Sequence, residues 1–407
     1  MDTVKLCELP PQIPTQAVLH PNTARNHHYV SQTEQRQHAF NTEVNANNQN
    51  VYRHAKAKQF ERGSVGQSVN IDHNLSAQDL YTLAQLRDGQ QYNMENWFVR
   101  YEGRFEADAL AAKLLTVGEQ ILPEEVARAL KVKWLSMLRN PLNADHFIVR
   151  HLSQAWQASL SQFAQTLEPY IHDRDDEARH KLAKQFGFTD KAYVSWLSFL
   201  YALLSDAVAT PSWLERITDL LIRHPDIKIE LFQDQNQVYT TVFADTGFAL
   251  QAASTGLSVG FSLDPHHWLV CHIPEAFWQQ MAQCWCVPAP EAGKQTLLVL
   301  AADASQAQLF NALMYKNAHS HVYAQQEQSA RLSSANVFKD GVISYYAACN
   351  PAIGLQDALY SSYQWHTAKK PRPSPPPPPS NICPAAKPTL FPPPARLLSA
   401  GFAHRCT

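Results

Sequence analysis

The sequence predicts an α+β fold, because helical and strand-like patterns occupy different parts of the chain. In the middle third, apolar residues recur at three- and four-residue steps, as on the buried face of a helix. After residue 225 the pattern changes to alternation with many β-branched residues, as in strands. We expect four parts in chain order: an extended N-terminal arm (1–75), a central helical bundle (76–224), a C-terminal mixed α/β part with a small sheet (225–368) and a Pro-rich tail (369–407).

The N-terminal arm is polar and rich in Asn, Gln and His. Only brief pieces such as residues 50–53 resemble strands. A segment of this composition buries little apolar surface when it is alone. We therefore expect the arm to lie on the rest of the protein rather than to form a core of its own.

Two helices are expected early in the bundle. Ser76 to Asp79 resemble a helix cap, and Met94, Trp97, Phe98, Tyr101 and Phe105 continue in helical register. The next helix should begin after Pro123, with two glutamates in its first turn, where acidic side chains are favourable. It should end at Asn140-Pro141, since a residue before proline avoids the helical conformation.

Three later segments are expected to complete the bundle. Apolar residues at helical spacing continue through 147–167. Two further helices should occupy roughly 190–206 and 211–223. The second of these has Thr210 as its expected cap and Pro211 in its first turn, the position where proline is tolerated.

Strands dominate the expected C-terminal part. Residues 227–231 alternate strictly between apolar and polar side chains, and residues 238–243 are rich in branched and aromatic side chains. Three further strands are expected at 257–263, 268–273 and 296–300, with helices at 274–284 and 304–317.

The tail contains two proline runs, at 375–379 and 392–394, within a sequence of low complexity. Pro-rich chains adopt extended, solvated conformations, so the tail is expected to be disordered. One interpretation is a linker or a ligand for proline-binding domains. The other is that the abrupt change after His366 reflects translation beyond a frameshift or a misjoined end, so we assign the tail no function.

Composition excludes several functional classes. The 34 basic and 36 acidic side chains nearly balance, so no overall charge attracts nucleic acid or anionic lipid. Only 13 glycines occur, and neither the dinucleotide nor the Walker-type glycine pattern is present. The seven cysteines are odd in number and irregularly spaced, which predicts neither a disulfide framework nor a zinc site. We expect no cofactor.

No membrane association is expected from the sequence. It has no apolar stretch of the roughly 18 residues that a spanning helix needs. The N-terminus also lacks the charged and then apolar order of a signal peptide. The cytoplasm is therefore the expected location.

One short run in the arm gathers polar groups of several kinds: Arg25-Asn26-His27-His28-Tyr29-Val30-Ser31-Gln32, continued by Arg36, His38, Phe40 and Asn41. The run follows neither helical nor strand periodicity. Such a composition is typical of a loop that carries polar side chains to a site.

This run resembles the opening motif, of His-Tyr-Val-Pro type, of the bacterial domain-of-unknown-function family numbered 4238. The sequence departs from the family at Ser31, where a proline is usual, and at 243–248, which replaces a turn of Ser-Asp-Asn-Pro type. The family has no settled activity, so the resemblance implies a divergent member without an assigned reaction. Further matching segments follow in the family's order at 50–53, 96–115, 242–248, 260–265 and 311–323.

Four residues are the candidate catalytic groups: His28, Tyr29, Arg36 and Glu102. The imidazole of His28 can act as acid or base, the Tyr29 hydroxyl can donate, and the Arg36 guanidinium can bind an anion. Glu102 lies beside the apolar helical stripe, one turn before Glu106. The structural alternative is that His28 and Tyr29 anchor the arm by burial and hydrogen bonds, while the two glutamates form a solvated face.

Five further residues are candidate binding groups. Arg25, His27 and Gln32 belong to the opening run, whereas Asp245 and Asn311 lie in later segments that resemble the family. Asp245 stands in Ala-Asp-Thr-Gly, which also occurs in aspartic proteases of retroviral type. That chemistry needs a pair of aspartates, and the surrounding pattern is not duplicated, so we take this match as accidental. No metal ligands are assigned.

The sequence leaves open whether the protein is an enzyme. One hypothesis is a nuclease-like effector, an RNase toxin in bacterial defence against phage or in conflict, with nucleic acid as its partner. Histidine, tyrosine and arginine near helical carboxylates suit phosphodiester cleavage. The alternative is a non-catalytic binding or sensor protein in which the histidines are structural. Metal-dependent hydrolysis ranks last, because no metal-ligand spacing is present.

Overall fold

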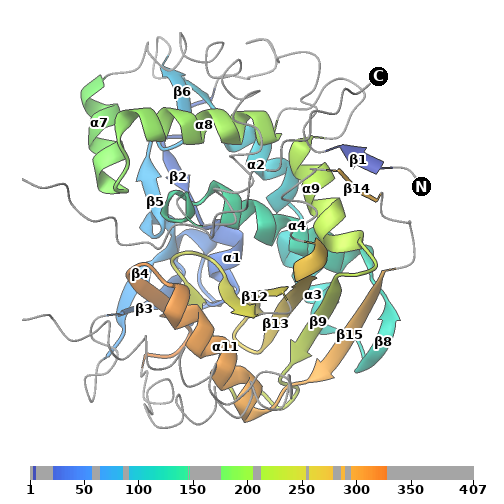
Figure 1. Ribbon diagram of the computed structural model, residues 1–407. Helices are drawn as coiled ribbons and strands as arrows, with labels where there is room; N and C mark the ends of the chain where they lie inside the picture. The colour runs from blue at the N-terminus through green and yellow to red at the C-terminus, as the bar shows by residue number, and fades with distance from the viewer. Residues whose placement is uncertain are drawn as a thin grey trace, which may run out of the picture. The chain divides into compact units, whose positions relative to one another are not determined.

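A six-stranded mixed sheet, with helices on both of its faces, organises the protein (Figure 1). The computed structural model describes residues 3–5, 22–56, 65–85, 91–144, 146, 176–204, 212–253, 256–277, 286–288 and 295–327. All of these residues belong to one unit, 1–358, in which the elements pack on one another. The expected α+β fold is confirmed.

The six strands come from distant parts of the chain. Only β9 and β15 pair in parallel; every other neighbouring pair is antiparallel. In spatial order the sheet contains β11 (Ala249–Ala253), β12 (Gly256–Asp264), β13 (His267–Pro274), β9 (Lys228–Gln233), β15 (Thr296–Ala301) and β8 (Gly118–Ile121).

In the described part of the chain, six helices form the bundle, and α4 lies at its centre. Twelve of the side chains of α4 are buried, on all sides of the helix, which is the pattern of a helix inside a core. The helices are α2 (Glu95–Glu102), α3 (Phe105–Lys113), α4 (Glu124–Arg139), α7 (Asp176–Gln185), α8 (Asp190–Leu204) and α9 (Trp213–Arg223).

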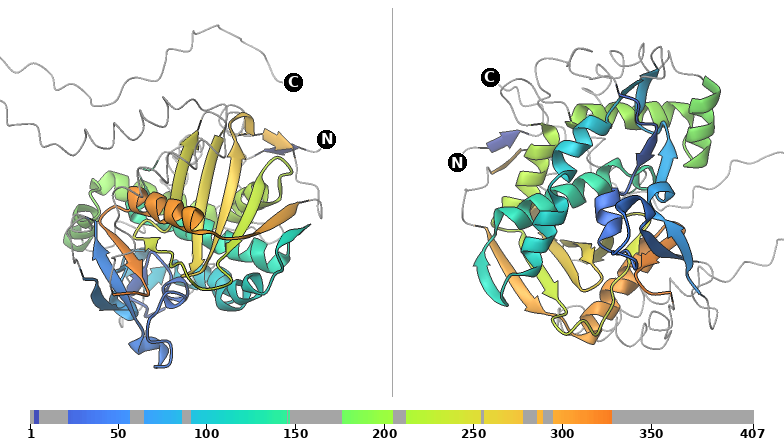
Figure 2. Two further views of the ribbon diagram at one scale, coloured as in Figure 1. Left: turned by 90° about the horizontal axis from the view of Figure 1, so that it is seen from below. Right: turned by 180° about the vertical axis from the view of Figure 1, so that it is seen from behind.

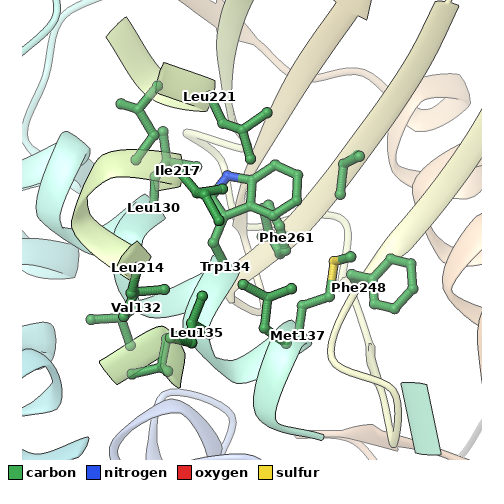
Figure 3. Packing of buried hydrophobic residues seen from close by; sticks show 14 of the residues in the cluster. Leu130, Val132, Trp134, Leu135, Met137, Leu214, Ile217, Leu221, Phe248 and Phe261 are labelled. Carbon is green, nitrogen blue, oxygen red and sulfur yellow. The ribbon is translucent and has the colours of Figure 1, made fainter. Parts of the chain in front are cut away.

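The main core lies between this bundle and one face of the sheet. Trp134 on α4 is fully buried, and its ring meets Phe261 of β12 edge to face at 5.4 Å between centroids. Figure 3 shows apolar side chains from α4, α9 and the sheet around this indole. The side chains of β12 and β13 that point toward the bundle, among them Phe261 and Leu269, enter this core.

The opposite face of the sheet carries α11 (Ala304–Asn317), which crosses the strands in Figure 2. Phe310 of α11 stacks on Trp268 of β13 with 5.4 Å between ring centroids. Gly260 of β12 permits this approach, because a Cβ there would lie 2.9 Å from a ring carbon of Phe310.

The N-terminal arm pairs with the C-terminal part of the chain in a β-sheet. Strand β3 (Asn50–Ala55) pairs with β16 (His321–Ala324), which joins segments more than 260 residues apart in a second, four-stranded sheet. That sheet also contains β4 (Gln67–Asn70) and β10 (Phe243–Ala244). The other elements of this region are β2 (Asn26–His28), α1 (Gln32–Arg36), η2 (Ala46–Asn48), η3 (Ile71–His73), β5 (Ser76–Gln78), β6 (Thr82–Gln85) and β7 (Gln91–Asn93).

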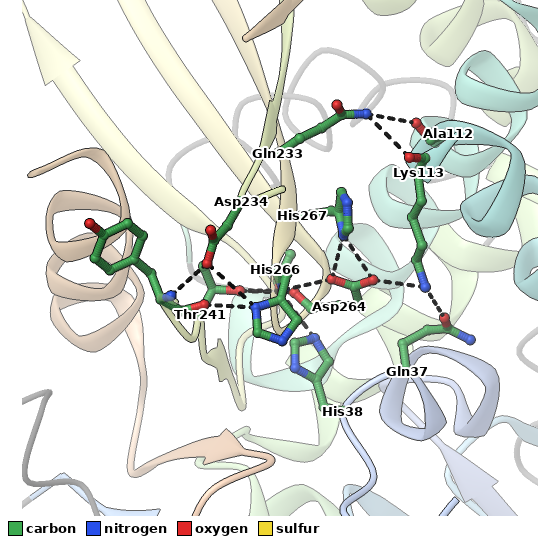
Figure 4. A network of polar contacts seen from close by, with 12 residues as sticks. Gln37, His38, Ala112, Lys113, Gln233, Asp234, Thr241, Asp264, His266 and His267 are labelled. Atoms are coloured by element: carbon green, nitrogen blue, oxygen red, sulfur yellow. Dashed lines mark hydrogen bonds and ion pairs between the residues drawn. The ribbon is translucent and has the colours of Figure 1, made fainter. Parts of the chain in front are cut away.

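A polar network, drawn in Figure 4, fastens the arm to the bundle and the sheet. Asp264, the last residue of β12, accepts from Lys113 of α3 at 2.8 Å and from His267 at 2.9 Å. Burial alone would raise the pKa of Asp264, but the charges and hydrogen bonds of His267 and Lys113 outweigh it and hold this pKa below its usual range. Lys113 also donates to Gln37 of the arm, at 3.0 Å.

Several expected elements differ in the structure. The expected helix cap at Ser76 is wrong: Ser76–Gln78 is strand β5, paired with β2, and the helix begins only at Glu95. The cap of α9 is Ser212, not Thr210, and forms a reciprocal capping box with Glu215. Of the strand expected at 238–243, only β10 forms. Residues 147–167, most of 274–284 and the tail lie outside the described residues.

The remaining short elements are η5 (Pro141–Asn143) and the strand pair of β1 (Thr3–Lys5) with β14 (Cys286–Pro288). Among the residues that the structure describes, no helix combines the length and the apolar character needed to cross a lipid bilayer.

Candidate functional site

Two glutamates at opposite ends of α2 face the same way. Glu95 begins the helix and Glu102 ends it, and their separation of two turns places them on one face. Phe98 lies between them on that face and is fully buried. The two carboxyls therefore lie on the same face of α2 as the buried Phe98 ring.

Arg139, the last residue of α4, lies against this stripe. Its Nη2 is 2.5 Å from Oε1 of Glu102, and its guanidinium carbon is 4.4 Å from the centroid of the Phe98 ring. The Arg139 side chain is only 1% exposed. The Tyr81 hydroxyl donates to the Arg139 carbonyl at 3.2 Å, which satisfies one of the terminal acceptors of α4.

A second buried ion pair lies close to the first. Glu34 of α1 accepts from Lys133 at 2.6 Å and from the hydroxyl of Ser136, both on α4. Its Oε1 also accepts from Ser31 at 3.2 Å. Glu34 therefore has Lys133 as its counter-ion and two hydroxyl donors. The direct ion-pair partner of Arg139 is Glu102 instead.

Burial makes the two α2 carboxyls weaker acids than usual, and the nearby cation of Arg139 opposes this effect. Burial raises the pKa of Glu102 to about 7, against the attraction of Arg139 and with help from the charge of Glu34. Burial likewise raises the pKa of Glu95 to about 7, with Arg139 opposing and Glu102 adding repulsion. With their pKa values raised to this range, both carboxyls are partly protonated at neutral pH.

Arg139 itself keeps its charge. Burial opposes ionisation of the guanidinium, but the carboxyls of Glu102 and Glu95 outweigh burial and raise the pKa of Arg139. The cation is therefore permanent, and the protonation of the cluster changes on the carboxyls.

Some polar atoms of this cluster have no hydrogen-bond partner among the described residues. They are Oε1 of Glu95, Oε1 of Glu102 and Nε of Arg139, all of them buried. Oε1 of Glu102 nevertheless has its ion pair with Arg139. Buried polar atoms are nearly always paired, so each of these exceptions needs a physical reason, of which a bound ligand is one. The side chain of Glu102 is 17% exposed, which gives the cluster an accessible edge.

His28 lies near the same cation, because the charge of Arg139 acts on its imidazole. Burial lowers the pKa of His28 to about 4, although a hydrogen bond with the Ile71 carbonyl, at 3.2 Å, partly offsets burial. Its side chain is therefore neutral at pH 7. Tyr29 packs edge-on against Phe186, and burial, followed by the charge of Asp245, raises the pKa of its phenol.

The neighbouring histidine is fully engaged in structure. His27 is fully buried, its Nδ1 accepts from the Tyr81 backbone N–H at 2.9 Å, and its Nε2 lies 3.0 Å from the Ala24 carbonyl. Its ring stacks on that of Tyr81. Both ring nitrogens therefore have protein partners, and the arm is anchored at this point.

The other candidates from the opening run form local contacts. Arg25 makes a two-point ion pair with Asp79, with distances of 3.0 and 2.5 Å. Gln32 donates to Asp72 at 2.9 Å and accepts from Arg36 at 2.7 Å. The structure thus brings His28 and Glu102 to the surroundings of Arg139, whereas the Arg36 guanidinium contacts Gln32.

The two later candidates hold loops in place. The buried carboxylate of Asp245 accepts from the backbone N–H groups of His319, Ser320 and His321 at 2.7 to 2.9 Å, and from the Ser320 hydroxyl at 2.8 Å. Asn311 accepts from the Val242 N–H at 2.9 Å and donates to the Thr240 carbonyl at 2.8 Å. Each fastens a segment of backbone.

Sequence reasoning missed Glu95, Tyr81 and Arg139. It paired Glu102 with Glu106, but the structure places Glu106 at the exposed surface and opposes Glu102 to Arg139 instead. The spacing of Glu95, Phe98 and Glu102 along one face was a usable pattern. No group of three or more metal-ligating side chains occurs in the described part of the chain.

The comparisons with known proteins found no matching family model, no matching curated protein and no matching solved structure. The resemblance to the 4238 family therefore stays a prediction from the motif.

Proposed function

We propose that the protein is a nuclease-like enzyme that cleaves RNA by general acid–base catalysis at Glu95, Glu102 and Arg139. The observation that carries the proposal is the pair of α2 carboxyls, each with its pKa raised to about 7 beside one buried cation. A side chain transfers protons most efficiently when its pKa lies near the working pH of the enzyme.

Two partly protonated carboxyls suit the two halves of RNA cleavage. The ionised carboxyl of the pair takes the proton of the ribose 2′-hydroxyl, whose oxygen then attacks the phosphorus. The protonated carboxyl gives its proton to the departing 5′-oxygen, leaving a cyclic phosphate. Arg139 supplies positive charge for the phosphoryl oxygens in the transition state. Glu102 is the better placed of the two for contact with substrate, because part of its side chain is exposed.

Glu102→Gln should abolish cleavage while leaving the fold intact. The amide keeps the size of the side chain but cannot transfer a proton, so we expect RNA cleavage to fall at least ~100-fold. The measurement compares host growth and RNA integrity after expression of the full chain, followed by cleavage assays with the purified protein. The matched control is Glu106→Gln, which changes an exposed carboxyl four residues later, in the first turn of α3, and should retain full activity.

Equal RNA cleavage by a folded Glu102→Gln variant would remove the catalytic role of this carboxyl. A cleavage rate that does not change between pH 5 and 9 would contradict the acid–base pair. The role of an effector in defence against phage or in conflict between bacteria rests on the family resemblance alone.

A second candidate function is non-catalytic binding or sensing, with the arm as a structural element. The observation that favours it is the state of the opening run, in which His27 has partners on both ring nitrogens and His28 contacts a backbone carbonyl. His28→Ala belongs in the same assay for this reason. If neither this variant nor Glu102→Gln changes RNA integrity while both remain folded, binding is the better account.

A further inference from the structure

The outer face of the six-stranded sheet carries a second group of reactive side chains, remote in sequence from the α2 carboxyls. Ser258 of β12, His272 of β13 and Glu230 of β9 project from this face. Ser258 Oγ is 2.8 Å from His272 Nδ1, and His272 Nε2 is 2.9 Å from Glu230 Oε2. The three side chains form an unbroken chain of hydrogen bonds through the imidazole.

Strand register places these groups together. Ser258 and His272 are direct partners between β12 and β13, so their side chains lie side by side on one face. Lys228 is the partner of His272 on β9, and Glu230 follows two residues later on the same face. The rigid ladder of three adjacent strands, rather than a loop, therefore fixes the spacing.

The hydrogen bonds also define the protonation of the imidazole. An ionised carboxylate only accepts, so in the neutral imidazole the ring proton is on Nε2, which donates to Glu230. Nδ1 is then the bare nitrogen and accepts from the Ser258 hydroxyl. This is the arrangement in which an imidazole can take a proton from serine while a carboxylate stabilises the imidazolium that forms.

The three residues line a groove of about 440 Å³. The groove is open to solvent at the catalytic groups, since the side chains of His272 and Glu230 are 32% and 21% exposed. Its apolar wall includes Phe232 and Trp268 from the sheet and Phe310 from α11. Lys228 also lines the groove and brings a positive charge to the end occupied by His272.

We propose that this groove is a second active site, which hydrolyses small carboxylic esters with Ser258 as nucleophile, His272 as general base and Glu230 as its orienting carboxylate. The apolar wall selects an ester with an apolar acyl group. This site is separate from the α2 carboxyl cluster and does not depend on the function proposed for that cluster.

The reaction balances with water as the only co-reactant. Ser258 Oγ attacks the ester carbonyl and gives its proton to His272 Nδ1, and the positive charge of Lys228 is near the oxyanion that forms. The carbon–oxygen bond to the alcohol breaks, and His272 returns the proton to the departing alkoxide. Water then attacks the acyl-serine with His272 again as base, which releases the carboxylic acid and restores Ser258.

The test uses the full chain and two probes, a fluorophosphonate that phosphonylates activated serines and p-nitrophenyl butyrate as ester. We expect the fluorophosphonate to label one serine per chain, which peptide mass should identify as Ser258. The Ser258→Ala variant should not be labelled. His272→Gln should lower ester hydrolysis at least ~100-fold. The matched control is Ser68→Ala, which removes an exposed serine on strand β4 and should leave both readouts unchanged.

Ser258→Ala removes one oxygen from a partly exposed position, so its folding can be verified by thermal melting against the wild type. An unlabelled wild-type protein, or equal labelling of folded Ser258→Ala, would overturn the proposal. Glu102→Gln should keep the full labelling and ester hydrolysis, so a failure of the RNA-cleavage proposal does not affect this outcome.

Discussion

Arg139→Met should lower the free energy of unfolding by about 3–5 kcal/mol at pH 8 and by clearly less at pH 5. The substitution removes the cation that Glu95 and Glu102 share, so an ionised carboxyl is left in the core without a partner. At pH 5 both carboxyls take up protons, and neutral carboxyls cost much less to bury. Urea denaturation followed by circular dichroism at the two pH values measures the difference.

The control for this variant is Arg223→Met on α9. Arg223 pairs with Glu124, whose side chain is 59% exposed, and exposed ion pairs contribute at most about 1 kcal/mol. The control should therefore show a small loss that does not grow at pH 8. If Arg139→Met destabilised the protein equally at both pH values, the loss would not come from the ionised carboxyls of Glu95 and Glu102.

Trp134→Ala should cost about 3–5 kcal/mol of unfolding free energy, because it empties the centre of the main core. The indole is fully buried and contacts Phe261, so its removal affects the packing of α4 against the sheet (Figure 3). Chemical denaturation measures the loss. Val99→Ala on α2, at a position 61% exposed, is the comparison and should stay within about 0.5 kcal/mol. A loss below about 1 kcal/mol for Trp134→Ala would mean that this core is packed differently.

The elements that sequence patterns predicted well are those with local boundaries. Helix α4 runs from Glu124 to Arg139, as expected from Pro123 and Asn140-Pro141, because a proline acts on its immediate neighbours. Strands β12 and β13 contain the expected ranges 257–263 and 268–273. In these cases the residues within and next to each element were enough to predict its bounds.

The errors arise where distant partners decide the structure. Ser76 to Asp79 resemble a cap, but this segment pairs with Asn26–His28 as a strand, and Asp79 has a positive φ of 59°. A left-handed residue there ends the strand in a turn rather than beginning a helix. The pairing partner lies some fifty residues upstream, which no local pattern reveals.

The candidate site shows the same limit. Glu102 was identified from its position beside an apolar stripe, yet its counter-ion, Arg139, lies on another helix, 37 residues later in the chain. The motif in the arm singled out His28, but its carbonyl partner at Ile71 follows from the fold of the arm. The Ser258, His272 and Glu230 group depends on strand register, which the sequence alone does not specify.

The most direct test of the proposed acid–base pair is a titration of the Glu95 and Glu102 carboxyls, whose pKa values burial raises to about 7. Protein labelled with ¹³C at the glutamate side-chain carboxyls is titrated by NMR from pH 3 to 9. We expect two resonances with midpoints near pH 7. In Glu102→Gln one of them should vanish and the other should move to lower pH, because the repulsion by Glu102 is gone. If every glutamate titrated below pH 5, the raised pKa values and the acid–base function built on them would be contradicted.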